Sequence, residues 1–360
     1  MRIAFFINTP AQAHTWRYII ENLIEDGHQV KILARNYDSA PVLLDKYGFD
    51  YEIYIEPGRY RHLRSLQIIP HVWHGYRFAI RFKPHIIIGF GIIEALTSFF
   101  LKKPCLVFTD SEPVPLQNYL NKLFSSVVLT PDCFNGDFGN KHIRIPGYKE
   151  LAYLHPNYFQ PDPGILNELG LGDKEKYIIL RFNAFDAVHD IGRRGFSLSD
   201  KYKLVRELEK YARVFIRSEK KLPIDLEAYN LPISFDHIHH ALYYAQLLVT
   251  DTQTMTTEAA ILGTPAVRCN NFVGPDDMGN FIELEQKYGL IYNYREPDKA
   301  IEKAVELIQR PSLKEEWQQK REVLLKDKID ITAFMVWFIE IYPKSYKDIK
   351  QNPGLQYSFR

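Results

Sequence analysis

Two carboxylates follow a short apolar run in the first half of the chain. The run reads CLVF, and Thr109-Asp110-Ser111-Glu112 comes directly after it. Carboxylates two residues apart at the end of a buried strand are suited to general acid/base catalysis. The structural alternative is a loop in which Asp110 or Ser111 caps the next helix.

Further polar groups and glycines stand at two other strand ends. Asn8 and His14 follow the first apolar run of the chain, and a helix N-terminus beside His14 would disfavour its charged form, as a neutral base requires. Gly89 and Gly91 permit close backbone approach after a later run, and Glu94 comes early in the following helix. A histidine bound to a backbone carbonyl and a glutamate that balances a helix dipole are the alternatives. The candidate catalytic residues are therefore His14, Glu94, Asp110 and Glu112, and the further cleft residues are Asn8, Gly89 and Gly91.

A polar turn in the second half of the chain has the composition of an anion site. The apolar run LLVT leads through Asp251-Thr252-Gln253 into a helical pattern over 254–262. Free backbone N–H groups at such a helix start bind anions, and threonine hydroxyls add donors. Glu258 lies one turn inside, where its carboxylate can accept both hydroxyls of a ribose. We expect Thr252 or Thr254 to cap this helix; the structural alternative is that Thr254 does no more than that and Glu258 balances the helix dipole.

Three basic side chains could add positive charge to that anion site. Arg181 follows the run YIIL and could bind a diphosphate bidentately. His189 could contact the phosphate or the sugar, and Arg217 ends the next predicted strand. A solvated loop is the alternative for the segment around His189.

Apolar runs alternate with helical patterns along the whole chain, and such runs indicate parallel sheets covered on both faces. The predicted strands are 3–7, 29–34, 50–55, 85–91, 105–108 and 127–130, then 177–182, 213–217, 247–250, 265–268 and 290–292. The predicted helices are 16–24, 43–47, 62–82 and 92–101, then 199–211, 239–245, 254–262, 278–288, 298–309, 313–325 and 331–342.

Length and a break in the pattern predict two domains. A single core rarely exceeds about 300 residues, and this chain has 360. The alternation stops over 147–164, where three prolines stand. We expect an α/β chain with a doubly wound, Rossmann-like domain over 1–150, completed by the C-terminal helix in 331–360, and a second such domain over 164–330. Ligands of these sheets bind beyond the carboxyl ends of the strands, so two facing domains would enclose the site.

The segment from Val249 to Pro265 resembles a known nucleotide-binding motif. Val249-Thr250-Asp251-Thr252-Gln253-Thr254-Met255-Thr256-Thr257-Glu258-Ala259, followed by Leu262-Gly263-Thr264-Pro265, is similar to the TDSGGxQEEAxxLGxP pattern of non-hydrolysing UDP-N-acetylglucosamine 2-epimerases. MurG-type glycosyltransferases have a related version. The stretch from Ile7 to His14, with Gly27-His28, resembles an uncharacterised prokaryotic family of unknown function related to both.

This resemblance implies a GT-B fold with the nucleotide-sugar donor in the second domain. Glu258 would bind the ribose, Thr252, Gln253 and Thr254 would contact the diphosphate, and no metal or other cofactor would be needed. The chain departs from the motif where Gln253 and Thr254 replace two glycines and Thr257 replaces the first glutamate.

We expect a glycosyltransferase that uses a nucleoside-diphosphate sugar, most simply a UDP-sugar, with an acceptor that the sequence does not define. The replaced glutamate counts against a 2-epimerase, which is the first alternative. A non-catalytic nucleotide-sugar-binding protein is the second.

Net charge and cysteine content exclude or favour further functional classes and cellular locations for this protein. Lys+Arg number 45 against 44 Asp+Glu, a formal net charge of +1, which excludes a non-specific nucleic-acid binder. The segment 57–93 contains no acidic residue and holds six basic ones among aromatic rings. It predicts either peripheral contact of 59–83 with an anionic membrane or a basic outer helix. Three cysteines without a CxxC pair agree with a cytoplasmic protein, at most bound to the inner face of the membrane.

Overall fold

The chain divides into two units, each built on one parallel sheet. The computed structural model describes residues 1–37, 39–54, 68–172, 175–183 and 194–360. Unit 1 comprises Met1–Tyr153 and Lys328–Arg360, and unit 2 comprises Leu154–Asp327. Among the described residues, no helix is both long and apolar enough to cross a bilayer.

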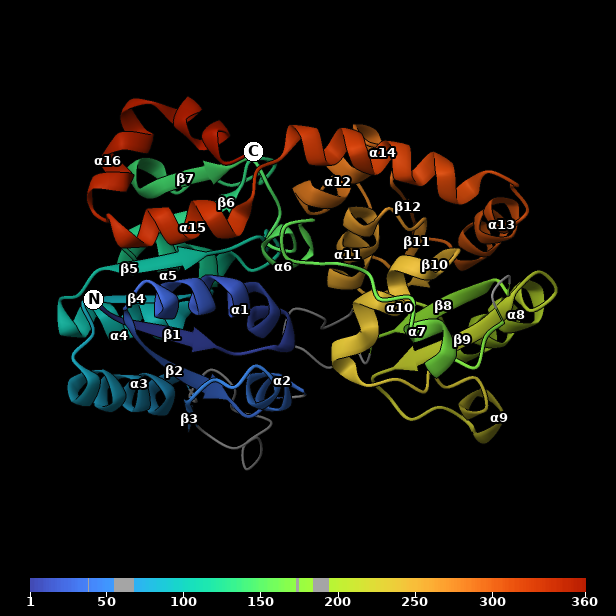
Figure 1. The fold of residues 1–360 in the computed structure, drawn as a ribbon, viewed down its shortest axis with the longest axis horizontal. Helices are drawn as coiled ribbons and strands as arrows, with labels where there is room; N and C mark the ends of the chain where they lie inside the picture. Colours follow the sequence, from blue (N-terminus) through green and yellow to red (C-terminus); the bar gives the residue numbers. More distant parts are fainter. Residues whose placement is uncertain (38, 55–67, 173–174, 184–193) are drawn as a thin grey trace. The chain divides into compact units, whose positions relative to one another are not determined.

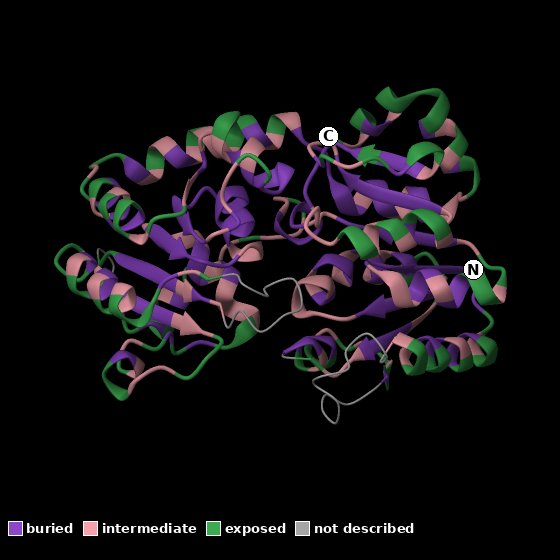
Figure 2. Ribbon diagram, turned by 180° about the vertical axis from the view of Figure 1, so that it is seen from behind, coloured by how far each residue is buried: buried purple, intermediate pink, exposed green. Residues whose placement is uncertain are grey.

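Unit 1 contains a seven-stranded parallel sheet of order β3-β2-β1-β4-β5-β6-β7. Its strands are β1 Arg2–Ile7, β2 Gln29–Arg35, β3 Tyr51–Tyr54, β4 Ile86–Gly89, β5 Cys105–Phe108, β6 Val127–Pro131 and β7 His142–Ile145. The central strands are apolar and buried on both faces (Figure 2), because helices cover both sides of a parallel sheet.

Two groups of helices cover the unit 1 sheet. Its helices are α1 Pro10–Glu25, α2 Ala40–Lys46, α3 Ile68–Phe82, α4 Ile92–Leu101, α5 Pro115–Phe124, α15 Ile331–Glu340 and α16 Lys344–Gln351, with the short α6 Leu151–Leu154 at the junction with unit 2. Helix α1 packs against α2 and α15, and α4 packs against α3 and α5 (Figure 1). Right-handed crossovers place α1 and α2 on one face of the sheet and α3, α4 and α5 on the other.

Unit 2 contains a five-stranded parallel sheet of order β12-β11-β10-β8-β9. Its strands are β8 Tyr177–Phe182, β9 Arg213–Ser218, β10 Leu247–Thr250, β11 Ala266–Cys269 and β12 Ile291–Tyr294. Its helices are α7 Ile165–Glu168, α8 Leu198–Leu208, α9 Ile224–Glu227, α10 Ile238–Tyr244, α11 Thr254–Leu262, α12 Gly279–Gln286, α13 Pro297–Ile308 and α14 Leu313–Asp327.

The predicted alternation is confirmed, and it missed several short elements, α6 and α7 among them. The predicted α4 and α11 match the observed bounds, and each predicted strand lies within about two residues of an observed one. The helix predicted over 62–82 is described from Ile68 onward. Helices α5, α9 and α16 and strand β7 were not predicted, because they are short or bury few apolar side chains.

Candidate functional site

The predicted nucleotide residues gather where the strand order of unit 2 reverses. Strands β8 and β10 are neighbours, with Thr250 opposite Arg181, and the chain continues from them toward opposite edges of the sheet. Ligands of doubly wound sheets bind in the crevice at such a reversal, beyond the carboxyl ends of the strands.

Among the residues that the structure describes, no side chain caps the start of α11. Its N-cap is Gln253, whose side chain accepts no capping hydrogen bond. The Thr252 and Thr250 hydroxyls lie 2.8 Å apart, so Thr252 is engaged with the strand end. The prediction that Thr252 or Thr254 caps the helix was therefore wrong. A helix start without a side-chain cap presents its N–H groups to an anion.

Glu258 lies one turn into α11 and is held by a histidine. Its Oε1 is 2.9 Å from Nε2 of His239 on α10, and both residues are only 5% exposed. His239 was not predicted as a site residue. A signal for it was present, because three histidines lie within 237–240. The pair fixes the orientation of the carboxylate that was predicted to bind the ribose.

Two of the three predicted basic groups lie side by side. Arg181 on β8 is opposite Arg217 on β9 in the strand register. Arg181 pairs with Glu219 at 2.5 Å, and the Arg217 guanidinium lies 4.1 Å from the ring centre of Phe235. His189 lies outside the described residues. The paired strands thus bring two guanidinium groups to the carboxyl edge of the sheet.

Asp251 is a buried carboxyl that the sequence analysis left without a role. Its oxygens accept hydrogen bonds from the backbone N–H of Asn183 at 2.7 Å and of Phe196 at 3.3 Å. Burial raises the pKa of Asp251 to about 7. A Cβ at Gly195 would lie 2.3 Å from this side chain, which accounts for the glycine. Asp251 joins the end of β8 to the segment that precedes α8.

Asn8 and His14 stand at the corresponding reversal in unit 1, beside β1 and β4. Asn8 Oδ1 accepts a hydrogen bond from the Tyr54 hydroxyl, and its N–H donates to Gln12. His14 Nδ1 is 2.7 Å from the Tyr47 hydroxyl, and its ring stacks on Tyr153 with centroids 5.3 Å apart. The side chains of Tyr47 and Tyr153 thus orient the half-buried His14.

Glu94 lies inside unit 1 and turns back toward its own helix start. The side chain is 0% exposed, and Oε1 accepts the N–H of Gly91. Burial raises the pKa of Glu94 to about 7. A Cβ at Gly89 would meet this carboxylate at 2.1 Å, so the glycine makes room for Glu94 rather than for a ligand. This geometry favours the structural alternative for Glu94 and Gly89, and Gly91 is the N-cap of α4.

Asp110 has a cationic partner. Lys149 donates a hydrogen bond to Asp110, and its Nζ lies 3.2 Å from Glu150. Burial alone would lower the pKa of Lys149, but the charges of Asp110 and Glu150 outweigh burial and raise it. Asp110 is therefore part of a buried charge cluster.

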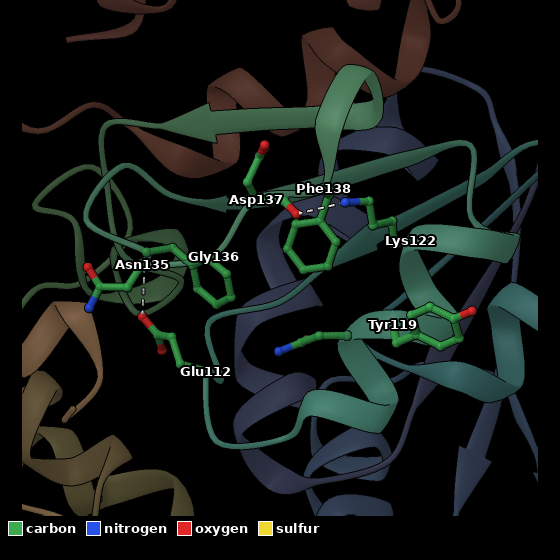
Figure 3. Close-up of a pocket in the computed structure, with 9 residues that line it drawn as sticks. Glu112, Tyr119, Lys122, Asn135, Gly136, Asp137 and Phe138 are labelled. Atoms are coloured by element: carbon green, nitrogen blue, oxygen red, sulfur yellow. Dashed lines mark hydrogen bonds between the residues drawn. The ribbon is translucent and has the colours of Figure 1, made fainter.

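Glu112 lines a cavity of about 350 Å³ beside α5 (Figure 3). Its Oε1 accepts the backbone N–H of Asn135 at 3.3 Å. Lys122 and the aromatic residues Tyr119, Phe134 and Phe138 also line this cavity. The two carboxylates predicted as a pair thus differ in their surroundings. Asp110 accepts a hydrogen bond from the Lys149 ammonium, whereas Glu112 lines a cavity.

Solved structures with the same fold include epimerases and glycosyltransferases. MnaA of S. aureus, solved with UDP, aligns at 12% identity over 96% of this chain and 98% of that chain, with a TM-score of 0.70. The UDP-GlcNAc 2-epimerase of Neisseria meningitidis, bound to UDP-GlcNAc, aligns at 12% identity over 93% of this chain and 98% of that chain, with a TM-score of 0.62. MurG of Acinetobacter baumannii aligns at 16% identity over 94% of this chain and 99% of that chain, with a TM-score of 0.58. No protein with a curated function matches the sequence.

The two parallel sheets and these neighbours define the class: the chain has the GT-B fold. It belongs to the family described as protein of unknown function DUF354, whose model matches residues 3–338. The expected membership of an uncharacterised family is confirmed, and the chain shares its fold with the epimerases and MurG.

Proposed function

We propose that this protein is a glycosyltransferase whose unit 2 binds a nucleoside-diphosphate sugar, with UDP as the nucleotide. The observation that carries the proposal is the uncapped start of α11 with the buried Glu258 one turn inside, at the strand reversal of unit 2. Helix N–H groups suit the diphosphate, and an oriented carboxylate suits the ribose hydroxyls. UDP in the S. aureus protein and UDP-GlcNAc in the N. meningitidis enzyme support this choice of nucleotide.

The charges around this helix suit a departing diphosphate. Arg181 and Arg217 end adjacent strands, and guanidinium groups bind phosphate oxygens bidentately. In the proposed reaction these cations and the α11 N–H groups stabilise the negative charge that develops on the leaving group.

A transferase fits the proton-transfer groups of unit 1 better than an epimerase does. Elimination and re-addition of a nucleotide need paired acids and bases, whereas transfer needs one base for the acceptor hydroxyl. Glu94 is enclosed and Asp110 is bound by Lys149. We assign the base to Glu112 or His14, and place the acceptor on the unit 1 side.

Replacement of Glu258 tests the donor site. Glu258→Ala should weaken UDP binding about tenfold or more in calorimetry, because charged hydrogen bonds to the ribose are lost. The exposed Glu302→Ala on α13 is the matched control and should bind UDP as the wild type does. Thermal unfolding of both variants checks that the fold is intact. Unchanged affinity in a folded Glu258→Ala protein would refute the donor site.

Incubation with UDP-N-acetylglucosamine alone separates the enzymatic alternatives. An epimerase converts the sugar without an acceptor, whereas the proposed transferase leaves it unchanged until an acceptor is added. UDP-sugar binding without turnover across a panel of acceptors would instead favour the non-catalytic binding protein.

A further inference from the structure

Helix α3 exposes large apolar side chains on its solvent side. Ile69, Trp73 and Ile80 are 72%, 57% and 46% exposed. Their spacing places them along one stripe of the helix, opposite the buried Phe78 and Ala79 that face the sheet. The Trp73 ring stacks on Tyr76 with centroids 5.9 Å apart. This outer stripe is apolar where a solvated helix is usually polar.

The next two helices expose apolar groups in the same way. Phe99 and Phe100, at the end of α4, are 54% and 61% exposed. On α5, Leu116, Tyr119 and Leu123 are 65%, 60% and 47% exposed, and their spacing of three and four residues forms a second stripe.

These side chains belong to one layer of unit 1. Helix α4 packs against both α3 and α5, and the Phe99 ring lies 4.9 Å from Phe124 at the end of α5. We call the outward surface of α3, α4 and α5 the α3–α5 face. Large contiguous apolar patches are uncommon on proteins that stay free in water, and they mark protein or membrane contacts.

The exposed charges carried by α3, α4 and α5 themselves are all positive, and the acidic groups Glu112 and Asp137 lie beside α5, in the cavity that Lys122 also lines. Within α3, α4 and α5 the only acidic residue is Glu94, which is fully buried. The exposed cations on these helices, or directly after them, are Arg77, Arg81, Lys83, Lys102, Lys103 and Lys122. Arg81 pairs with Glu52 of β3. Lys102 and Lys103 follow the exposed phenylalanines within two or three residues, so cations border the apolar groups.

We propose that the α3–α5 face docks on an anionic lipid bilayer. Aromatic and aliphatic side chains enter the headgroup region, while long basic side chains reach the lipid phosphates. A symmetric dimer through this face would bring two predominantly basic surfaces together, which opposes self-association. The surface extends the contact expected for 59–83 to α4 and α5. Arg59, Arg61 and Arg64 lie outside the described residues and carry none of the argument.

Vesicle sedimentation tests the proposal on the full chain. We expect the wild type to bind vesicles of phosphatidylcholine with about one-quarter phosphatidylglycerol, and to bind pure phosphatidylcholine at least about fivefold less. Phe100→Ser/Leu116→Ser should lower binding to the anionic vesicles about fivefold or more. The matched control Ile224→Ser/Val323→Ser changes two exposed apolar residues of unit 2, 83% and 59% exposed, and should bind like the wild type.

Charge reversal tests the basic part of the face. Lys102→Glu/Lys103→Glu should remove most of the preference for anionic vesicles. Lys344→Glu/Lys347→Glu, which alters two exposed lysines of α16, should retain it. Absence of wild-type binding to anionic vesicles would overturn the proposal. So would equal binding by the face and control variants, or a lipid-free dimer in sedimentation velocity that Phe100→Ser/Leu116→Ser abolishes. Because UDP affinity is measured separately, failure here leaves the proposed function standing.

Discussion

At the level of single residues, the environment of each candidate site residue depends on partners that are distant in the sequence. Strand ends predicted the positions of Asn8, Asp110 and Glu258. The partners of these residues are Tyr54, Lys149 and His239, each brought into contact only by the folded sheet and its helices. The sequence can therefore predict which polar residues lie near the strand ends. Whether a carboxylate is paired with a cation or enclosed depends on tertiary contacts that no local pattern contains.

The complete burial of Glu94 makes the stability of the protein depend on pH. Its carboxyl has a pKa of about 7 against 4.5 in the unfolded chain, because burial disfavours its charged form. Between these values the folded state holds the proton more tightly than the unfolded state does. The free energy of unfolding contributed by this group therefore falls as pH rises from about 4.5 to 7.

Glu94→Gln removes this titration and keeps an oxygen acceptor for the Gly91 N–H. The stability of Glu94→Gln relative to the wild type should rise between pH 4.5 and 8, by on the order of 3 kcal/mol. Urea unfolding at several pH values measures the difference. Glu25→Gln, an exposed position on α1, should give a difference that varies much less with pH. A constant difference for Glu94→Gln would show that the carboxyl titrates as in water.

At the scale of elements, burial decides what a sequence pattern can identify. Strands β4, β5, β10 and β11 are buried throughout and were predicted from their apolar runs. Helix α5 fully buries only Asn121 and exposes Leu116, Tyr119 and Leu123, so its pattern does not indicate a core element. Strand β7 is a four-residue edge strand in which His142 and Arg144 alternate with two isoleucines, and it was missed because this short segment contains no continuous apolar run.

The end of α11 explains part of the Leu-Gly-Thr-Pro motif without a nucleotide. Gly263 ends the helix at φ 70°, and α14 covers this end. Gln318 Nε2 donates to the carbonyls of Leu262 and Gly263, and Arg321 Nε donates to that of Ile261. Gly263 therefore supports the helix whose opposite end is proposed to bind phosphate.

Gly263→Ala should lower the free energy of unfolding by more than the backbone strain alone. A Cβ there would lie 2.6 Å from Gln318 Nε2 and 2.9 Å from Arg321 Cδ. Gly48→Ala is the matched control, because its φ is 71° and nothing lies within 4 Å of the added atom. We expect a loss of about 1 kcal/mol at Gly48 and about 2 kcal/mol or more at Gly263 in urea unfolding. Equal losses of unfolding free energy would mean that the side chains of α14 move away from the added Cβ without destabilising the protein.

At the scale of the whole molecule, the chain passes from unit 1 to unit 2 and back again. Length and alternation predicted two doubly wound domains, and the return of the C-terminal helix was expected from the GT-B resemblance. In the structure, α15 packs on α1, and Lys328 pairs with Asp132. Unit 1 thus needs residues that follow the whole of unit 2, and periodicity alone could not show which sheet they complete.

This connectivity predicts that a core change in α15 acts on unit 1 and leaves the proposed donor site of unit 2 unaltered. Phe338 is 0% exposed and packs against Phe334 at 5.6 Å between ring centroids. Phe338→Ala should lower the free energy of unfolding by about 3–5 kcal/mol, the usual loss for a buried phenylalanine. Val323→Ala on α14 is the control, because this valine is 59% exposed and should cost under about 0.5 kcal/mol. Below the unfolding transition, the UDP affinity of Phe338→Ala should stay within about twofold of the wild type, since Glu258 and its partner lie in unit 2. A parallel loss of UDP affinity in the folded variant would mean that nucleotide binding depends on unit 1.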